Sequence, residues 1–267
     1  MAKAKDTVSR TVIVALALCI VCSIIVSVAA VSLRPLQVEN RNLDIKSNIL
    51  SAAGLLERGS SADQIREQFN RFTVRLVNLE TGEYVDPQSL GLNDAMEFEQ
   101  YRAASDPAQS RSLSSQEDIA GIRRLPHVAQ VFLLEEDGEL SRIVLPIHGS
   151  GLWSTLYGFV SLQADANTIA GLGFYDHAET PGLGGEIDNP RWKQQWIDRQ
   201  VFGEDLRTPR IELVKGGVDA NTPDRQHKVD SLAGATLTAR GVENLVNFWM
   251  GEQGFGAYLN RLREGGA

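Results

Sequence analysis

A short run of small and polar residues near the C-terminus offers the clearest chemistry in this sequence. Residues 230–238 read Asp-Ser-Leu-Ala-Gly-Ala-Thr-Leu-Thr. Gly234 and Ala235 carry no large side chain, so a bulky group can approach the hydroxyl of Thr236 closely. The pattern therefore predicts a hydroxyl that is available for modification. The alternative interpretation is a turn of small residues that caps the following helix.

A second segment combines proline, glycine and polar residues. Residues 177–186 read His-Ala-Glu-Thr-Pro-Gly-Leu-Gly-Gly-Glu. Pro181 and the three glycines predict a tight, exposed loop whose backbone amides can reach a ligand. A plain surface turn is the alternative.

A third segment places aromatic residues beside glycines. Residues 148–159 read His-Gly-Ser-Gly-Leu-Trp-Ser-Thr-Leu-Tyr-Gly-Phe. Trp153 and Tyr157 offer flat apolar faces that suit a stacked ring system. Each of them could equally pack in the core from a strand.

Lys215 precedes two glycines and is a further candidate. An ammonium group beside a reducible ring would stabilise the negative charge that develops there. The alternative is an ordinary solvated lysine, as most lysines are.

Other kinds of chemistry lack support in the sequence. Cys19 and Cys22 lie in an apolar run, and the histidines show no metal-ligand spacing, so we predict no metal site. Ser154 is not in a Gly-x-Ser-x-Gly elbow, which argues against a serine hydrolase. The absence of Gly-x-Gly-x-x-Gly argues against NADH binding by this chain itself. A formal net charge of −8 argues against a nucleic-acid partner.

The three motifs together resemble those of a known family. The 230–238 run resembles the threonine flavinylation motif of bacterial respiratory flavoproteins, and the 177–186 loop resembles their His-x-Glu-Thr-Pro-Gly-x-Gly segment. The 148–159 run resembles the quinone-reductase branch. With the C-terminal segment 248–263, they make the chain similar to the covalent-FMN-binding membrane protein (the C subunit) of Na⁺-translocating NADH:quinone reductases.

The resemblance implies a set of site residues. A separate flavin transferase would join FMN, through its phosphate, to Thr236. Ala233 departs from the family pattern, which usually has Ser or Thr there. The residues expected to line the ring or ribityl chain are Glu179, Thr180, Leu183 and Gly184. The residues expected to contribute to its environment are Trp153 and Lys215, together with Gly234, Ala235, Leu237 and Thr238 beside the acceptor. No residue is expected to be catalytic.

The resemblance also implies a role and partners. The chain would be the covalent-FMN electron carrier of a six-subunit bacterial inner-membrane complex that passes electrons from NADH to ubiquinone and exports sodium. It would be inactive alone. One alternative is the flavinylated subunit of an Rnf-type electron-transport complex. Another is a membrane-anchored assembly subunit that never carries flavin.

An apolar segment predicts a single membrane span. The run from Thr11 to Leu33 is uncharged and would extend roughly 34 Å as a helix, enough for a hydrocarbon core of ~30 Å. It is too long for the apolar region of a signal peptide, which favours an uncleaved anchor. The short basic tail favours a cytoplasmic N-terminus and a periplasmic domain, although the flanking basic residues nearly balance.

The rest of the chain predicts an α+β domain. We divide it into a tail (1–10), a transmembrane helix (11–33), a membrane-proximal α+β region (34–125) and an FMN-binding domain (126–267). Helical spacing predicts a helix over 42–56, ended by Gly59, and another from Ser61 to about Phe69. Hairpins are predicted over 72–85 and 128–147, and a strand over 160–164. Further elements are a helix opened by Pro190, a short strand over 211–214, and helices over 239–250 and 255–263.

Overall fold

The computed structural model describes residues 8–57 and 59–265, in two compact units that divide between Asp44 and Ile45. Helix α1 (Val8–Ala52) forms the described part of the first unit and opens the second. By length and composition, α1 is the one described helix that could cross a membrane, and its most apolar window is not buried. This finding supports the predicted anchor. Residues 1–7 of the predicted tail lie outside the described residues.

The C-terminal end of α1 differs from the prediction. The sequence predicts a separate helix over 42–56, but α1 continues unbroken to Ala52. Gly54 then adopts a left-handed conformation (φ 74°), and the amide of Leu55 donates to the carbonyl oxygen of Leu50 at 2.8 Å. A left-handed glycine satisfies the last carbonyls of a helix in this way. The helix therefore ends before Gly59.

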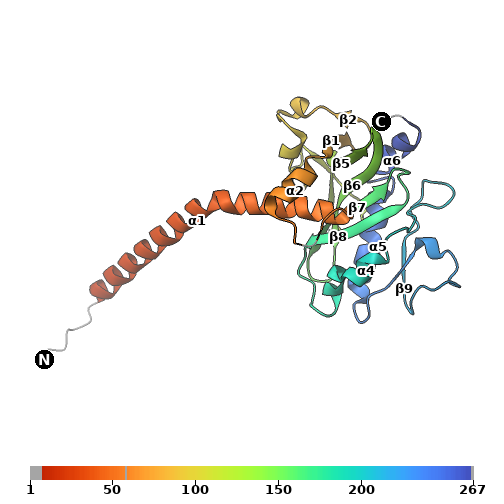
Figure 1. The fold of residues 1–267 in the computed structure, drawn as a ribbon. Helices are drawn as coiled ribbons and strands as arrows, with labels where there is room; N and C mark the ends of the chain where they lie inside the picture. Colours follow the sequence, from red (N-terminus) through yellow and green to blue (C-terminus); the bar gives the residue numbers. More distant parts are fainter. Residues whose placement is uncertain (1–7, 58, 266–267) are drawn as a thin grey trace. The chain divides into compact units, whose positions relative to one another are not determined.

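Six antiparallel strands form the main sheet of the second unit, in the order β2-β1-β5-β6-β7-β8 (Figure 1). The strands are β1 (Phe72–Asn78), β2 (Tyr84–Val85), β5 (Val128–Glu136), β6 (Glu139–Ser150), β7 (Thr155–Gln163) and β8 (Ile169–Asp176). The hairpin predicted over 128–147 is confirmed. Its turn has positive φ at Asp137 (55°) and Gly138 (83°), as a two-residue hairpin turn requires.

Two smaller sheets and several short helices complete this unit. The small sheets pair β3 (Ser110–Ser112) with β4 (Arg124–Pro126), and β9 (Glu212–Val214) in parallel with β10 (Lys228–Asp230). The α-helices are α2 (Ala62–Phe69), α3 (Gln100–Ser105), α4 (Pro190–Gln194), α5 (Thr236–Met250) and α6 (Gly256–Arg263). The 3-10 helices are η1 (Pro87–Leu90), η2 (Ala95–Glu97), η3 (Gly184–Asp188) and η4 (Arg225–His227). The α+β class is confirmed.

Helix α5 packs directly on the end of β6. A Cβ atom at Gly241 would lie 2.4 Å from the carbonyl oxygen of Ser150, and one at Gly149 would lie 2.6 Å from the Cβ of Leu245. Glycine at both positions lets the helix approach the strand closely. Burial of Val242 and Leu245 against the sheet then fixes the helix in place.

Several predicted boundaries need correction. Helix α5 begins at Thr236 and not at Ala239, and α4 ends at Gln194. Strand β7 begins at Thr155 and not at Val160, while β8 and β10 are absent from the prediction. Strand β1 pairs with β5, so residues on both sides of the boundary drawn at 125/126 share one sheet; that division stays a prediction.

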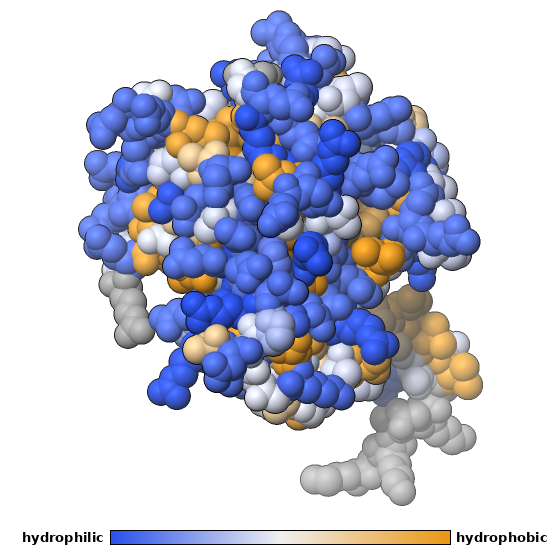
Figure 2. Space-filling view, turned by 90° about the vertical axis from the view of Figure 1, so that its right-hand side faces the viewer, coloured by the Kyte–Doolittle hydropathy of each residue, from blue (hydrophilic) through white to orange (hydrophobic). Residues whose placement is uncertain are grey.

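The surface of this unit is mainly hydrophilic. Figure 2 shows a face on which hydrophilic residues predominate and apolar residues form small, separated patches. Such a distribution is normal for a water-exposed domain. It contrasts with the exposed apolar residues of α1, from Val12 to Leu33.

Candidate functional site

Glu179 joins the three sequence motifs into one cluster. Its Oε1 accepts the backbone amide of Trp153 at 2.9 Å, and its Oε2 accepts the hydroxyl of Thr238 at 2.5 Å. Trp153 belongs to the β6–β7 turn and Thr238 to the first turn of α5. The Glu179 side chain is buried and Thr238 is fully buried. A carboxylate removed from water requires such hydrogen bonds on its oxygens.

Two glycines make room for this carboxylate. A Cβ atom at Gly151 would lie 2.5 Å from Glu179 Oε1. One at Gly184 would lie 2.6 Å from both Glu179 Oε2 and Thr238 Oγ1. These glycines are therefore needed for close packing and not for a left-handed backbone.

Further contacts hold the 177–186 loop against its neighbours. The amide of Ala178 donates to Ser154 Oγ at 2.7 Å, which ties the loop to the β6–β7 turn. A Cβ atom at Gly234 would lie 3.1 Å from Leu183 Cδ2, so the loop also contacts the segment before α5. The amides of Leu183 and Gly185 donate to the carbonyl oxygen of Thr180 at 3.1 and 2.9 Å, closing a tight turn.

Thr236 is accessible and is the first residue of α5. The preceding residue, Ala235, has no side chain that could accept a hydrogen bond from the helix. The first amide bonded to the residue before the helix is that of Ala239, which donates to Ala235 at 3.0 Å. Unbonded amides and the helix dipole favour an anion at such a terminus. The Thr236 hydroxyl has no hydrogen-bond partner among the described residues.

Exposed apolar side chains come from the same three motifs. The exposed fractions are 68% for Trp153, 57% for Leu237, 45% for Leu183 and 45% for Leu152. Large apolar side chains at this exposure, next to small residues, are typical of a surface that receives a flat ligand. Thr180 is also exposed.

Lys215 lies at the end of β9, close in the fold to the 230–238 run. The amide of Ser231 donates to the carbonyl oxygen of Val214 at 2.8 Å. The side chain of Lys215 is exposed and has no ion pair within residues 8–57 and 59–265. The parallel β9–β10 pairing thus places this lysine beside Ser231, near the start of the 230–238 run.

Tyr157 belongs to a different environment from Trp153. Its ring stacks on His148 (centroids 5.9 Å apart) and packs edge-on against Tyr101 (4.8 Å). His148 also contacts Trp249 (5.1 Å). Burial lowers the pKa of His148 to about 4 and raises the pKa of Tyr101 well above its usual value. Tyr157 is half-buried and packs against these rings, so it does not belong to the exposed surface that Trp153 offers.

Sequence reasoning missed two supports of the site. The sequence offered Ser154 no role beyond that of a hydrolase nucleophile, which its spacing argues against, yet its hydroxyl oxygen accepts the amide of Ala178. His177 Nε2 lies 2.8 Å from Asp188 Oδ2, and Lys193 Nζ lies 3.2 Å from Asp188 Oδ1. The sequence could not predict this pair, because ten residues separate His177 from Asp188. The two side chains meet only through the conformation of the loop that leads into η3.

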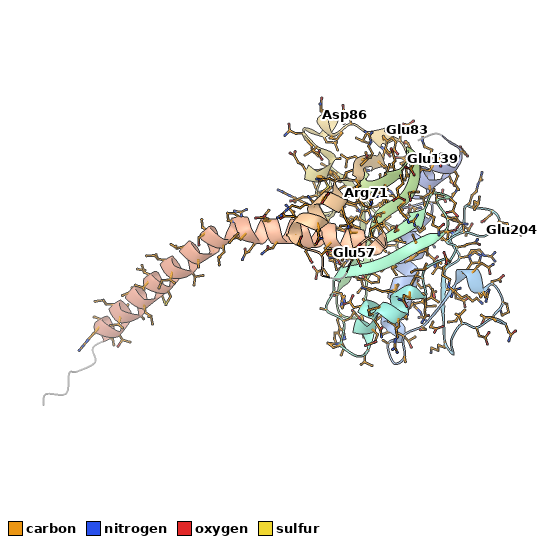
Figure 3. The ribbon with its side chains drawn as sticks, viewed as in Figure 1. Glu57, Arg71, Glu83, Asp86, Glu139 and Glu204 are labelled. Atoms are coloured by element: carbon orange, nitrogen blue, oxygen red, sulfur yellow. The ribbon has the colours of Figure 1, made fainter. Side chains whose placement is uncertain are left out.

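A polar cleft lies outside the cluster that the three motifs form. It measures about 950 Å³ and lies between the 203–208 and 224–227 segments. Glu204 on its rim points outward from the domain (Figure 3). It shares no lining residue with the cluster around Thr236. No group of three or more His, Cys, Asp or Glu side chains that could hold a metal occurs in the described part of the chain.

Comparisons with known proteins agree with this geometry. The family of FMN-binding domains matches residues 151–251, a range that contains Trp153, the 177–186 loop and Thr236. A curated relative, the C subunit of the Na(+)-translocating NADH-quinone reductase of Pseudomonas aeruginosa, is 46% identical and covers 98% of this chain and 99% of its own. The protein of the same name from Yersinia pestis is 45% identical, over 97% of this chain and 95% of its own.

This chain belongs to the NqrC family, the C subunits of Na⁺-translocating NADH-quinone reductases. The crystal structure of Shewanella oneidensis NqrC matches with a TM-score of 0.74 and 35% identity, over 82% of this chain and 96% of that one. The corresponding protein from Parabacteroides distasonis matches with a TM-score of 0.65 and 27% identity, over 85% and 96%. The family assignment confirms the resemblance read from the three motifs. It leaves the Rnf-type alternative without support.

Proposed function

We propose that this chain carries FMN as a phosphoester on Thr236 Oγ1 and serves as an electron-transfer subunit of a Na⁺-translocating NADH-quinone reductase. The observation that carries the proposal is the exposed Thr236 hydroxyl at an uncapped helix start, beside exposed apolar side chains from two other motifs. When bound, FMN supplies a ring that accepts and donates electrons, with a potential set by nearby charges and hydrogen bonds.

The chain's own residues would bind and orient the cofactor. Trp153 and Leu183 offer apolar surface to the ring, and Leu237 extends that surface. Lys215 would contribute a positive charge to the surroundings of the ring and stabilise negative charge on its pyrimidine part. Thr180 and Gly184 would shape the loop beside the ribityl chain.

Glu179 is buried and would support the site without contacting the cofactor. Both of its oxygens accept hydrogen bonds within the protein. Its proposed contribution is therefore to fix the positions of Trp153 and Thr238 relative to the acceptor threonine. Gly234 and Ala235 would leave space for a flavin transferase to reach the hydroxyl. Ala233 is exposed, and nothing in the contacts of the site requires a hydroxyl there.

Mass spectrometry tests the covalent bond directly. Trypsin should release the peptide Val229–Arg240, since Lys228 and Arg240 bound it. We expect this peptide from the chain co-expressed with a flavin transferase to carry the added mass of an FMN phosphoryl group. Thr236→Val should lose the added mass completely. Ser231→Ala, which removes another hydroxyl of the same peptide, should keep it. An unmodified Thr236 in protein from its own host would support the assembly-subunit alternative.

The membrane arrangement is a second part of the proposal. We propose that α1 anchors the chain in the bacterial inner membrane with the domain in the periplasm, as one of six different proteins in the complex. Protease added to spheroplasts should digest the domain, and protease added to inverted vesicles should spare it. The purified single chain should oxidise NADH far more slowly than the complex; a comparable rate would contradict the carrier role.

A further inference from the structure

The first turn of α5 has no side-chain cap, whereas α2 and α4 each have one. Ser61 caps α2 and Asn189 caps α4, each through a side-chain oxygen. At α5 the corresponding residue is Ala235, and no side chain accepts a hydrogen bond from the helix start. Such an end leaves its first amides for an external acceptor.

Arg240 lies one turn beyond Thr236 on the same side of this helix. Residues four apart are neighbours on a helix surface, and long side chains point back toward the N-terminus. Arg240 is exposed. Its guanidinium makes no hydrogen bond and no ion pair among the residues that the structure describes. By this helical spacing, Arg240 is a cation one turn from the acceptor threonine, with no partner among the described residues.

The acidic groups near Arg240 already have other partners. Glu243 Oε2 accepts the amide of Leu213 at 2.7 Å. Asp118, which shares a cleft of about 270 Å³ with Arg240, accepts the amides of Ile122 and Arg123, both at 2.8 Å. Backbone amides thus already occupy both oxygens of Asp118 and one oxygen of Glu243.

We propose that Arg240 is a positioning residue for the cofactor phosphate: its guanidinium donates hydrogen bonds to the non-bridging oxygens of the phosphoester on Thr236. This inference rests on the proposed function. A phosphodiester carries one negative charge, and the fork of an arginine matches two of its oxygens. The chain has a formal net charge of −8, so a local cation offsets an otherwise unfavourable field.

Phosphorus NMR of the flavin-bearing full chain in detergent tests the contact. The ³¹P resonance of the phosphoester should differ between the native wild-type chain and the same chain unfolded in urea. Arg240→Gln should move the native resonance toward the unfolded value, and Arg240→Lys should recover part of the difference. Arg207→Gln, which removes an exposed arginine from the 203–208 segment beside another cleft, should leave the resonance in place.

A salt series on the wild-type chain provides a readout that needs no variant. Raising NaCl from about 0.05 M to about 1 M shortens the screening length from more than ~10 Å to ~3 Å, so the native resonance should move toward that of Arg240→Gln. A resonance that is the same in wild type and Arg240→Gln, or that salt does not move, overturns the role of Arg240. An unmodified Thr236 in the wild-type chain instead overturns the proposed function itself.

Discussion

Glu179, which contacts the β6–β7 turn, and His148, which lies in β6, are both buried titratable residues, but their surroundings differ. Glu179 is 4% exposed, and each of its oxygens accepts a hydrogen bond from a different motif. His148 is 6% exposed, lies among the rings of Tyr101, Tyr157 and Trp249, and its Nδ1 has no partner among the described residues.

The difference separates a polar anchor from a packing residue. A buried group with partners on every polar atom fixes the relative positions of those partners. A buried imidazole without partners avoids the charged form, which is why burial lowers the pKa of His148 to about 4. Glu179 thus fixes the positions of the Trp153 amide and the Thr238 hydroxyl. His148 instead packs among aromatic rings and bonds to none of the site residues.

The largest expected effect follows removal of the polar anchor. Glu179→Ala leaves the buried Thr238 hydroxyl and the part-buried Trp153 amide without their acceptor, and each such loss costs free energy. We expect the free energy of unfolding to fall by about 3 kcal/mol, measured by urea denaturation, with a parallel loss of flavin occupancy. Glu204→Ala removes an exposed carboxylate and should change neither quantity. Equal effects of the two variants would contradict the anchoring role.

The next effect is a dependence of stability on pH that originates at His148. Its pKa in the folded chain lies below the unfolded value near 6.5, so its contribution is fully present above about pH 6.5 and is lost as pH falls toward about 4. Between about pH 7.5 and about pH 5, this group should account for a loss of about 2 kcal/mol. His148→Phe keeps an aromatic ring and should lack that part of the loss in urea denaturation at the two pH values.

The carboxylates serve as an internal control for this measurement. Asp106 and Glu136 have lowered pKa values, chiefly because of a hydrogen bond from the Ala108 amide and from the Ser141 hydroxyl, respectively. Their contributions are lost at lower pH than that of His148 and are equal in both chains. An identical pH profile for wild type and His148→Phe would show that His148 does not titrate as its burial indicates.

The smallest effect concerns the space around the anchor. Gly184→Ala introduces a Cβ atom 2.6 Å from Glu179 Oε2 and Thr238 Oγ1, and overpacking of this kind costs about 1 kcal/mol or more. Thermal unfolding should show the loss. Gly173→Ala is the matched control, because its Cβ atom would meet nothing within 4 Å. If the control destabilised the chain more than Gly184→Ala, the crowding around Glu179 would not be the cause.

Local features are predictable from the sequence and distant pairings are not. The hairpin turn at Asp137-Gly138 and the capping box from Ser61 to Gln64 are both found where predicted, because each depends on a few adjacent residues. Strand β8 escaped prediction because its glycines weaken a strand pattern. One of them, Gly171, is required since a Cβ atom there would lie 2.3 Å from the carbonyl oxygen of Ala52, at the end of α1.

The amino-acid sequence by itself determined the apolar segment, the three motifs and the threonine expected to carry the cofactor, because these depend on residue type and short spacing. Only the tertiary structure decided that Glu179 faces Trp153 and Thr238, that the Tyr157 ring packs against His148 and Tyr101, and that α5 starts at Thr236 without a side-chain cap. The physical reason is that hydrogen bonds of a buried carboxylate and close approach at glycines join segments far apart in the chain. No local pattern encodes which partner each will meet.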